Sequence, residues 1–396
     1  MKYNVIIIGA GQAGFTVALS LRKRKYKGSI LLVGDEKYLP YQRPPLSKDF
    51  LSDEVEVQRL LIKPETFFEA HKIKVLTKSP VRKINNQTKT VELKNNKSFE
   101  YEKLVVCAGS RVRKITLSCQ QDRIHYLRTI TDAIKIKSSL ESAKEIAILG
   151  GGYIGLELAA SAIKKGLKVR LIEMEDRLMK RSLSKSMAKF IENKHLLKGV
   201  EILLNTSVED INDFNDKKSI LLTNGERLDV DTVIIGVGIE PNIDLALQAG
   251  VHCSNGIDVN EYGQTSDPNI FAAGDCTCHP NKIFDKKLRL ESVQNASDQA
   301  KAVAASIMGL KEPYAKTPWF WSDQYNLKLK IAGLTQNYDY EFFQGDAKNE
   351  KFAIFFIKDN KLIGVESVNH QKAFLLGRKL IGNQSIIPED KTNFFN

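Results

Sequence analysis

The chain has 396 residues, which is enough for two or three domains that each bury their own core. No apolar run approaches the ~20 residues of a membrane-spanning helix, so we expect no membrane segment. The formal net charge of +12 favours either an acidic partner or a lysine-rich surface without function, and nucleic acid is disfavoured because no basic run is interleaved with aromatic residues.

The cysteines are few and scattered. They are Cys107, Cys119, Cys253, Cys276 and Cys278, and no two of them form a C-x-x-C pair. An odd, scattered set is typical of a reducing compartment, so we expect a cytoplasmic protein. The sequence predicts no metal site, because Cys276 and Cys278 have no second pair of ligands at the spacing that zinc needs.

The first 36 residues have the order of a dinucleotide-binding unit. An apolar run at Val5–Ile8 is followed by the glycine turn Gly9–Gly14, an amphipathic segment from 15 to 25 and a second apolar run at Ile30–Val33. This pattern predicts a strand, a turn, a helix and a strand. The turn is expected to bind a pyrophosphate at the helix N-terminus, with contacts from Gly9, Gly11, Ala13 and Gly14.

An acid after the second strand of such a unit binds the ribose hydroxyls of the nucleotide. Gly34 occupies the usual position of that acid, and Asp35 and Glu36 follow it. Either carboxylate is close enough in sequence to serve, so the residues alone leave both open.

A proline-rich segment from 38 to 48 comes next and contains three prolines. Proline fixes the backbone and favours a rigid, extended loop. Such a loop beside a cofactor turn can hold a side chain in place, and Lys48 is the candidate; the alternative is a solvated surface lysine. Short strands then alternate with turns as far as Cys107, where the small residues Ala108 and Gly109 are expected to approach the nucleotide.

The same order returns in the middle of the chain. A strand at Glu145–Leu149 leads to the glycine turn Gly150–Gly155, a helix that ends near 165 and a strand at Val169–Ile172. Further short strands follow and close on a second small-residue turn. Two such units predict two bound dinucleotides. The expected contacts of the second unit are Gly150, Gly152, Ile154, Gly155, Glu173, Gly236, Val237 and Gly238.

The acid of the second unit predicts the choice of coenzyme. A carboxylate at Glu173 accepts hydrogen bonds from a ribose 2′-OH but repels a 2′-phosphate, and Glu175 adds to that repulsion. The positive charges of Arg177 and Arg181 weakly favour a 2′-phosphate, although Arg181 is also close enough in sequence to contact a pyrophosphate. If the dinucleotide of this unit is a nicotinamide coenzyme, the sequence therefore predicts NADH over NADPH.

The last third of the chain completes the first unit and adds a small domain. Gly274 and Asp275 follow a short strand, where the acid can accept a bond from a cofactor hydroxyl. A helix is expected over 296–308, and its N-terminus brings positive potential. An aromatic stretch from Trp319 leads into strands at 327–332, 352–357 and 362–368 and a helix at 372–380. The chain ends in a polar tail.

Taken in order, these motifs resemble those of the FAD-dependent ferredoxin reductases that serve oxygenases, within the glutathione-reductase-like flavoproteins. The segments that carry the resemblance are Arg43–Lys48, Gly150–Glu157, Gly236–Asn242, Gln264–Pro268, Glu291–Ala296 and Pro318–Gln324. The resemblance implies an α/β fold of two Rossmann-like nucleotide-binding domains and a small C-terminal α+β domain. FAD is expected on the domain of residues 1–110 and 240–318, NAD on 111–239, and the third domain spans 319–396.

The resemblance also implies roles for single residues. Lys48 and Glu157 are expected near the flavin N5, paired with each other, as the catalytic residues. Asp35 is expected on the FAD ribose, with Glu36 as the alternative. Further FAD contacts are implied for Arg43, Val81, Ala108, Gly109, Arg128, Gly274, Asp275, Glu291, Val293 and Trp321. Glu157 is also expected to border the nicotinamide of the NAD, and Arg181 is the candidate contact of its pyrophosphate.

The implied reaction is hydride transfer from NADH to FAD, followed by one-electron transfers to a small acidic [2Fe–2S] ferredoxin that supplies a dioxygenase or a cytochrome P450. We expect a monomer or a weak dimer. A disulfide reductase is disfavoured, because the chain has no cysteine before Cys107. A rubredoxin or nitrite-type reductase, an NADH oxidase, a monodehydroascorbate reductase and a redox sensor like apoptosis-inducing factor share the scaffold and stay open.

Overall fold

The computed structural model describes residues 1–52, 54–117, 119–388, 390 and 394–395. The chain forms two compact units, each made of three segments: Met1–Gln42, Gln58–Arg111 and Glu240–Phe320 in the first, and Arg43–Val57, Val112–Ile239 and Trp321–Asn396 in the second. The chain passes between units after Gln42 and within α2 (Val57–Leu60), β7 (Ser110–Val112), β16 (Ile239–Pro241) and β22 (Trp319–Gln324). Among the described residues, none of the helices has the length and hydropathy of a membrane span.

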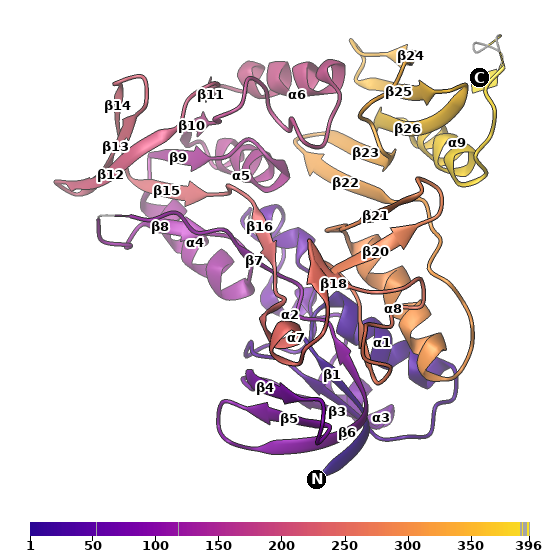
Figure 1. The fold of residues 1–396 in the computed structure, drawn as a ribbon. Coiled ribbons are helices and arrows are strands. Elements are labelled where there is room, and N and C mark those ends of the chain that lie inside the picture. The colour runs from indigo at the N-terminus through magenta and orange to yellow at the C-terminus, as the bar shows by residue number, and fades with distance from the viewer. Residues whose placement is uncertain (53, 118, 389, 391–393, 396) are drawn as a thin grey trace. The chain divides into compact units, whose positions relative to one another are not determined.

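The first unit is organised around a mainly parallel sheet (Figure 1). Its strand order is β3-β2-β1-β6-β5-β4, with β19 also paired to β6, and only β4 and β5 run antiparallel to their neighbours. The strands are β1 (Lys2–Ile8), β2 (Ile30–Val33), β3 (Ile73–Leu76), β4 (Val81–Asn85), β5 (Thr90–Leu93), β6 (Ser98–Val106) and β19 (Ile270–Ala272). All four residues of β2 are buried, as the continuous apolar run Ile30–Val33 predicts for a central parallel strand.

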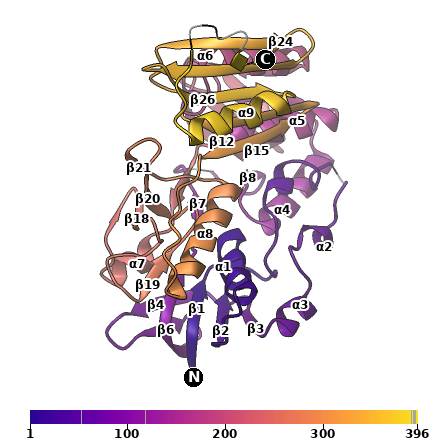
Figure 2. The same ribbon diagram turned by 90° about the vertical axis from the view of Figure 1, so that its right-hand side faces the viewer.

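Two helices of this unit lie side by side, α1 (Gln12–Lys23) and α8 (Val293–Ile307), as Figures 1 and 2 show. Phe15 and Val303, one from each helix, belong to the same buried cluster, and Gln12 Nε2 donates to Ser297 Oγ at 3.1 Å. The unit is completed by α3 (Glu65–Ala70), α7 (Asp244–Gln248) and a second small sheet of β17 (Cys253–Ser254), β18 (Gly256–Asp258), β20 (Thr277–Asn281) and β21 (Lys286–Leu288).

The second unit contains a fully parallel sheet in the order β11-β10-β9-β15-β8. Its strands are β8 (Ile124–Tyr126), β9 (Glu145–Leu149), β10 (Lys168–Ile172), β11 (Val200–Leu203) and β15 (Thr232–Ile235). The helices are α4 (Ile130–Ser142), α5 (Tyr153–Lys164) and α6 (Lys185–Leu197), and an antiparallel sheet adds β12 (Val208–Phe214), β13 (Lys217–Leu222) and β14 (Arg227–Val230). The expected α/β class is thus confirmed, with a mainly parallel sheet in the first unit and a fully parallel sheet in the second.

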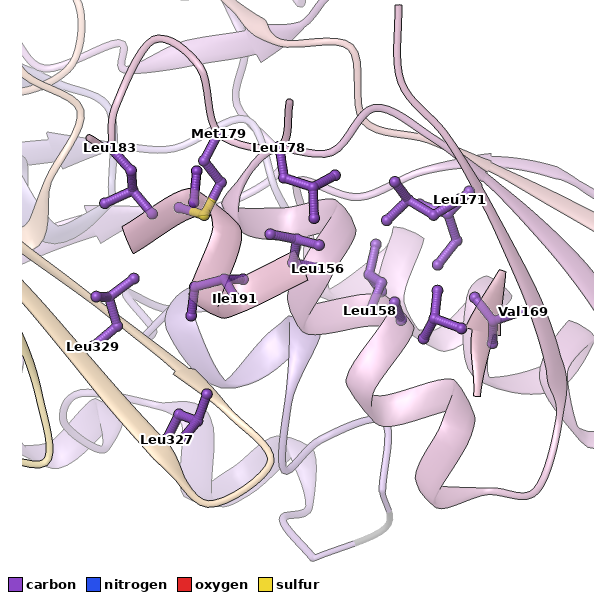
Figure 3. Packing of buried hydrophobic residues seen from close by; sticks show 14 of the residues in the cluster. Leu156, Leu158, Val169, Leu171, Leu178, Met179, Leu183, Ile191, Leu327 and Leu329 are labelled. Atoms are coloured by element: carbon purple, nitrogen blue, oxygen red, sulfur yellow. The ribbon is translucent and has the colours of Figure 1, made fainter. Parts of the chain in front are cut away.

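The C-terminal part of the second unit is an antiparallel sheet in the order β22-β23-β26-β25-β24, with α9 (Gln371–Gly382) packed on it (Figure 1). The further strands are β23 (Leu327–Gly333), β24 (Tyr340–Asp346), β25 (Lys351–Lys358) and β26 (Lys361–Val368). A continuous apolar cluster joins this sheet to the parallel sheet: Figure 3 shows Leu156 of α5, Ile191 of α6 and Leu329 of β23 within it. This packing holds α5, α6 and the C-terminal sheet together.

The structure differs from the sequence-based expectation in three places. Helix α8 begins at Val293, three residues early, because the Ser292 hydroxyl caps it by accepting from the Asn295 amide at 3.1 Å. The C-terminal sheet contains two strands that were not expected, β22 and β24. The end of the chain is not only a polar tail, since Phe395 is 1% exposed.

Phe395 offers a test of that last contact. Its ring stacks on Phe355 with centroids 4.1 Å apart and on Phe342 at 5.2 Å. Because Phe395→Ala removes a buried aromatic ring, we expect the free energy of unfolding to fall by about 3–5 kcal/mol. Phe394→Ala, at the half-buried neighbouring position, is the control and should cost much less in the same urea titration. Equal losses for the two variants would contradict the buried placement of Phe395.

Candidate active site

The first glycine turn has the backbone that its sequence predicts. Gly9 has a φ of +105°, and a Cβ at this position would overlap the carbonyl oxygen of Cys107. A Cβ at Gly14 would overlap the carbonyl oxygen of Gly9. At Gly11, in contrast, no described atom lies within 4 Å of a built Cβ. Gly9 and Gly14 therefore permit close packing, whereas Gly11 leaves open space at the N-terminus of α1.

The second glycine turn repeats this geometry. Gly150 has a φ of +104°, and its Cβ would lie 2.5 Å from the carbonyl oxygen of Gly236. A Cβ at Gly155 would overlap Gly150, and no described atom lies within 4 Å of one at Gly152. Because α1 and α5 both begin after a glycine that has no side chain to cap them, their first N–H groups suit a pyrophosphate. The residues of both turns fit dinucleotides.

The two units differ at the acid after the second strand. Val33 O accepts from Gly9 N, and Ile172 O accepts from Gly150 N, both at 2.8 Å, so Gly34 and Glu173 occupy corresponding positions. Glu173 accepts from the amides of Gly151 at 2.6 Å and Glu175 at 2.9 Å. These bonds fix its carboxylate at the glycine turn.

In the first unit the carboxylates come later in the chain. Asp35 is exposed, and Glu36 is half-buried and accepts from the Tyr41 hydroxyl at 2.6 Å. The Gly34 position is closed to a side chain, because a Cβ there would lie 2.7 Å from the Ala10 Cβ. The assignment of Asp35 rather than Glu36 to a ribose stays a prediction.

Several predicted residues of the first unit converge near the carboxyl ends of its strands. A Cβ at Gly274, whose φ is +93°, would lie 3.1 Å from the Ala13 Cβ and 3.9 Å from the Ala296 Cβ. This brings the end of β19 to the starts of α1 and α8. Asp275 accepts from Ser110 Oγ at 3.2 Å. The carbonyls of Ala108 and Gly109 both accept from Asn242. Glu291 pairs with Arg289, and Val293 is the first residue of α8. Val81 starts β4 and packs against the apolar cluster that contains Ile8 and Val33.

Lys48 and Glu157 form an ion pair within the second unit, with Lys48 Nζ 2.7 Å from Glu157 Oε2. Glu157 lies on α5 and is 3% exposed, and the Lys48 side chain is 15% exposed. The sequence holds Lys48 there because Pro44 and Pro45 start a short 3-10 helix, η1 (Pro44–Ser47). Leu46, Phe50 and Leu51 are buried on either side of Lys48 and fix the segment. The pairing expected from the resemblance is present.

The Glu157 carboxylate has further partners that sequence reasoning missed. Ser47 donates to Oε2, and Ser322 of β22 donates to Oε1 at 2.6 Å. The signal for Ser322 was its place in Pro318–Gln324, one of the segments that carry the family resemblance. Arg43 and Arg128 also come together, since Arg43 Nη1 donates to Arg128 O at 2.6 Å. Trp321 is half-buried on β22, next to Ser322.

The other predicted residues of the second nucleotide site surround its glycine turn. Gly236 lies against Gly150, as described, and Gly238 has a φ of +113°. Arg181 Nη2 lies 3.6 Å from a Cβ built at Gly238, so Arg181 and the turn of Gly236, Val237 and Gly238 are neighbours. Ile154, at the start of α5, is 43% exposed.

The cysteines do not form a redox site. Each of the five is a free thiol, and Cys107, Cys276 and Cys278 are buried. Burial raises the pKa of Cys276 to about 12 and raises the pKa of Cys107 well above its ordinary value. Because the thiolate is the reactive form, these two thiols are unsuited to disulfide exchange.

Comparison with known proteins finds two matching protein families and several similar reductases. Residues 3–300 match the family described as pyridine nucleotide-disulphide oxidoreductase, and residues 319–393 match the reductase C-terminal family. The chain is 40% identical over 383 residues to rhodocoxin reductase of Rhodococcus erythropolis, covering 96% of this chain and 90% of that protein.

Two solved structures are similar over nearly the whole chain. One is a ferredoxin reductase from Rhodopseudomonas palustris, with a TM-score of 0.93 and 37% identity over 97% of this chain and 95% of that one. The other is putidaredoxin reductase in a covalent complex with putidaredoxin, with a TM-score of 0.95 and 35% identity over 99% of this chain and 95% of that one.

The Lys48–Glu157 pair predicts a large stability effect. Lys48→Met leaves a buried carboxylate with hydroxyl donors alone, so we expect the free energy of unfolding to fall by about 3–5 kcal/mol. The double variant Lys48→Met/Glu157→Gln should lose less than the two single variants together. Lys164→Met breaks the exposed pair of Lys164 with Glu54 and should cost about 1 kcal/mol or less. Similar losses for Lys48→Met and Lys164→Met in urea titrations would contradict a coupled, buried pair.

Proposed function

The chain belongs to the pyridine nucleotide-disulphide oxidoreductase family and carries the reductase C-terminal domain, and we propose that it is an NADH-dependent FAD enzyme, a ferredoxin–NAD(+) reductase that supplies an oxygenase. The observation that carries this proposal is the buried Lys48–Glu157 pair. Lysine stands in the segment after the first nucleotide-binding unit, where disulfide-reducing enzymes of this scaffold carry cysteine. Likeness to rhodocoxin reductase and to putidaredoxin reductase along almost the whole chain supports the same function.

Lys48 and Glu157 are the proposed catalytic residues. Bound FAD would accept a hydride from the nicotinamide and pass electrons singly to an acceptor. The fixed positive charge of the Lys48 ammonium would stabilise the negative charge that develops on the flavin during such a transfer. The ammonium is pre-oriented because Lys48 Nζ lies 2.7 Å from Glu157 Oε2. Glu157 is itself held by Ser47 and Ser322, so the pair needs no rearrangement when charge develops.

The two glycine turns are the proposed phosphate sites. Amides at the start of α1 would receive the FAD pyrophosphate, and those at the start of α5 would receive the NADH pyrophosphate. We assign Asp35 to the FAD ribose and Glu173 to the NADH ribose. The other FAD contacts in the proposal are those implied by the resemblance, including Arg43, Arg128 and Asp275.

The proposed partner and compartment follow from charge and thiol chemistry. A chain with a net charge of +12 favours a small acidic protein as partner, and a [2Fe–2S] ferredoxin accepts one electron at a time. Five free thiols and a reaction that uses NADH suit a reducing compartment, so we place the reaction in the cytoplasm.

Electron transfer through a ferredoxin is the direct test of this function. With the FAD-loaded full-length protein, NADH should reduce cytochrome c rapidly only after a [2Fe–2S] ferredoxin from the same host is added, because cytochrome c reports ferredoxin reduction. Turnover with a rubredoxin but with no host ferredoxin would contradict the proposed acceptor. A long-lived NADH–flavin complex without turnover of either acceptor would favour the redox-sensor class instead.

Coenzyme choice tests the assignment of Glu173. We expect NADH to reduce the flavin much faster than NADPH at equal low concentration, since the carboxylate opposes a 2′-phosphate. Glu173→Gln should lower that preference about tenfold, which is a modest value for removing a like charge. Glu141→Gln, at an exposed position on α4, is the control and should leave the preference unchanged. Comparable rates with the two coenzymes in the unchanged protein would refute the assignment.

Ionic strength tests the proposed acidic partner. If the positive charge attracts the ferredoxin, ferredoxin-dependent turnover at low ferredoxin concentration should fall steeply between about 0.05 M and 0.5 M salt. Flavin reduction by NADH alone, measured under the same conditions, separates partner attraction from coenzyme binding. A flat salt response of turnover would assign the charge to a lysine-rich composition instead.

A further inference from the structure

A continuous line of hydrogen bonds leads from Glu157 through the interior of the second unit. Ser322 Oγ lies 2.6 Å from Glu157 Oε1, and Gln324 Nε2 lies 3.1 Å from Ser322 Oγ. Gln324 Oε1 lies 2.9 Å from His195 Nε2, and the Tyr325 hydroxyl lies 3.0 Å from His195 Nδ1. The side chains come from α5, α6, β22 and the turn after it, and the three in the middle are at most 1% exposed.

The carboxylate at one end fixes the direction of every bond. An ionised carboxylate only accepts, so the Ser322 hydroxyl proton points to Glu157. Ser322 then has no proton left to donate to Gln324 and must accept. The amide nitrogen of Gln324, Nε2, therefore faces Ser322. The carbonyl of Gln324 faces His195 and requires a proton on His195 Nε2. The opposite orientation of the Gln324 amide would break the Ser322–Glu157 bond.

The histidine suits this direction. His195 is fully buried, and that burial lowers its pKa to about 4, so the ring carries a single proton near neutral pH. With the proton on Nε2, Nδ1 accepts from the Tyr325 hydroxyl. Burial raises the pKa of Tyr325, which therefore keeps its proton as a donor. Each group from Tyr325 to Ser322 thus donates towards Glu157.

Buried apolar residues neighbour this polar line along the chain. Leu156 precedes Glu157 in α5, Ile191 comes one turn before His195 in α6, and Leu327 follows Tyr325 by two residues. All three apolar side chains belong to one buried cluster, in which Figure 3 labels them. Water is not expected to replace a lost partner in such surroundings, so a broken bond leaves an unsatisfied polar group. The packing therefore favours one fully bonded arrangement over alternatives.

We propose that Gln324 and His195 are positioning residues of the active site, which fix the Ser322 hydroxyl as a permanent donor to Glu157. With Oε1 held by Ser322, Oε2 is directed to Ser47 and Lys48, and the ammonium stays in one place. The direction of the bonds follows from the geometry and from the ionised carboxylate, and it does not depend on the proposed function. Its effect on hydride transfer rests on the proposed function.

The first experiment observes the histidine without measuring activity. Nitrogen–proton NMR of the full-length protein with isotope-labelled histidine reports which ring nitrogen carries the proton, and His195→Gln identifies the signal among the six histidines. The proposal predicts a neutral ring protonated on Nε2 between about pH 6 and pH 8. A ring protonated on Nδ1 alone, or an imidazolium in that range, would overturn it.

The second experiment measures flavin reduction by NADH in a single turnover. Ser322→Ala and Gln324→Glu should each slow the reaction about ten- to a hundredfold, the equivalent of one hydrogen bond to a charged group, with NADH affinity nearly unchanged. The double variant should be no slower than Ser322→Ala, because Gln324 acts only through Ser322. Ser322→Thr keeps the hydroxyl and should retain most of the rate.

The control for these variants is Asp323→Asn, at the exposed position between them, which should leave the rate unchanged. The positioning role would be overturned if the rate reductions of Ser322→Ala and Gln324→Glu multiplied in the double variant. An unchanged rate in Gln324→Glu would overturn it as well. Failure of NADH to reduce the flavin of the unchanged protein would reject the proposed function instead, and the histidine signal would still decide the direction of the bonds.

Discussion

The Glu157 carboxylate is the constraint on which the second unit depends. A buried charge is tolerated only when donors surround it. Those donors come from parts of the chain far apart in sequence: Ser47 and Lys48 from the proline-rich segment, and Ser322 from the first strand of the C-terminal sheet. One side chain on α5 thus connects three segments, and this explains why residues 43–57 pack in this unit.

The two nucleotide-binding units have similar backbone conformations at their glycine turns, but they have different residues after the second strand. Both glycine turns have nearly the same positive φ, which glycine adopts readily, and both approach the residue after a neighbouring strand closely. At the end of the second strand one unit has Glu173, bonded to the Gly151 amide, whereas the other has Gly34 against Ala10. The two turns thus have the same local fold, and they differ at the position that follows the second strand.

Sequence patterns predicted what is local and missed what depends on packing. The glycine turns and central strands were predictable, because residues adjacent in sequence determine their backbone conformation. The start of α8 was placed three residues late, since Ser292 was not recognised as its cap. Strand β24 was missed because it is largely exposed at a sheet edge. His195 and Gln324 carry no local signal, since only the packing of α6 against β22 brings them together.

Neutron diffraction from crystals of the full-length protein exchanged into heavy water tests the central claim most directly, because it locates protons around Glu157. The account predicts deuterons on Lys48, Ser47 and Ser322 that point to the carboxylate, and none on the carboxylate itself. A deuteron on either Glu157 oxygen, or a Ser322 deuteron directed to Gln324, would contradict it.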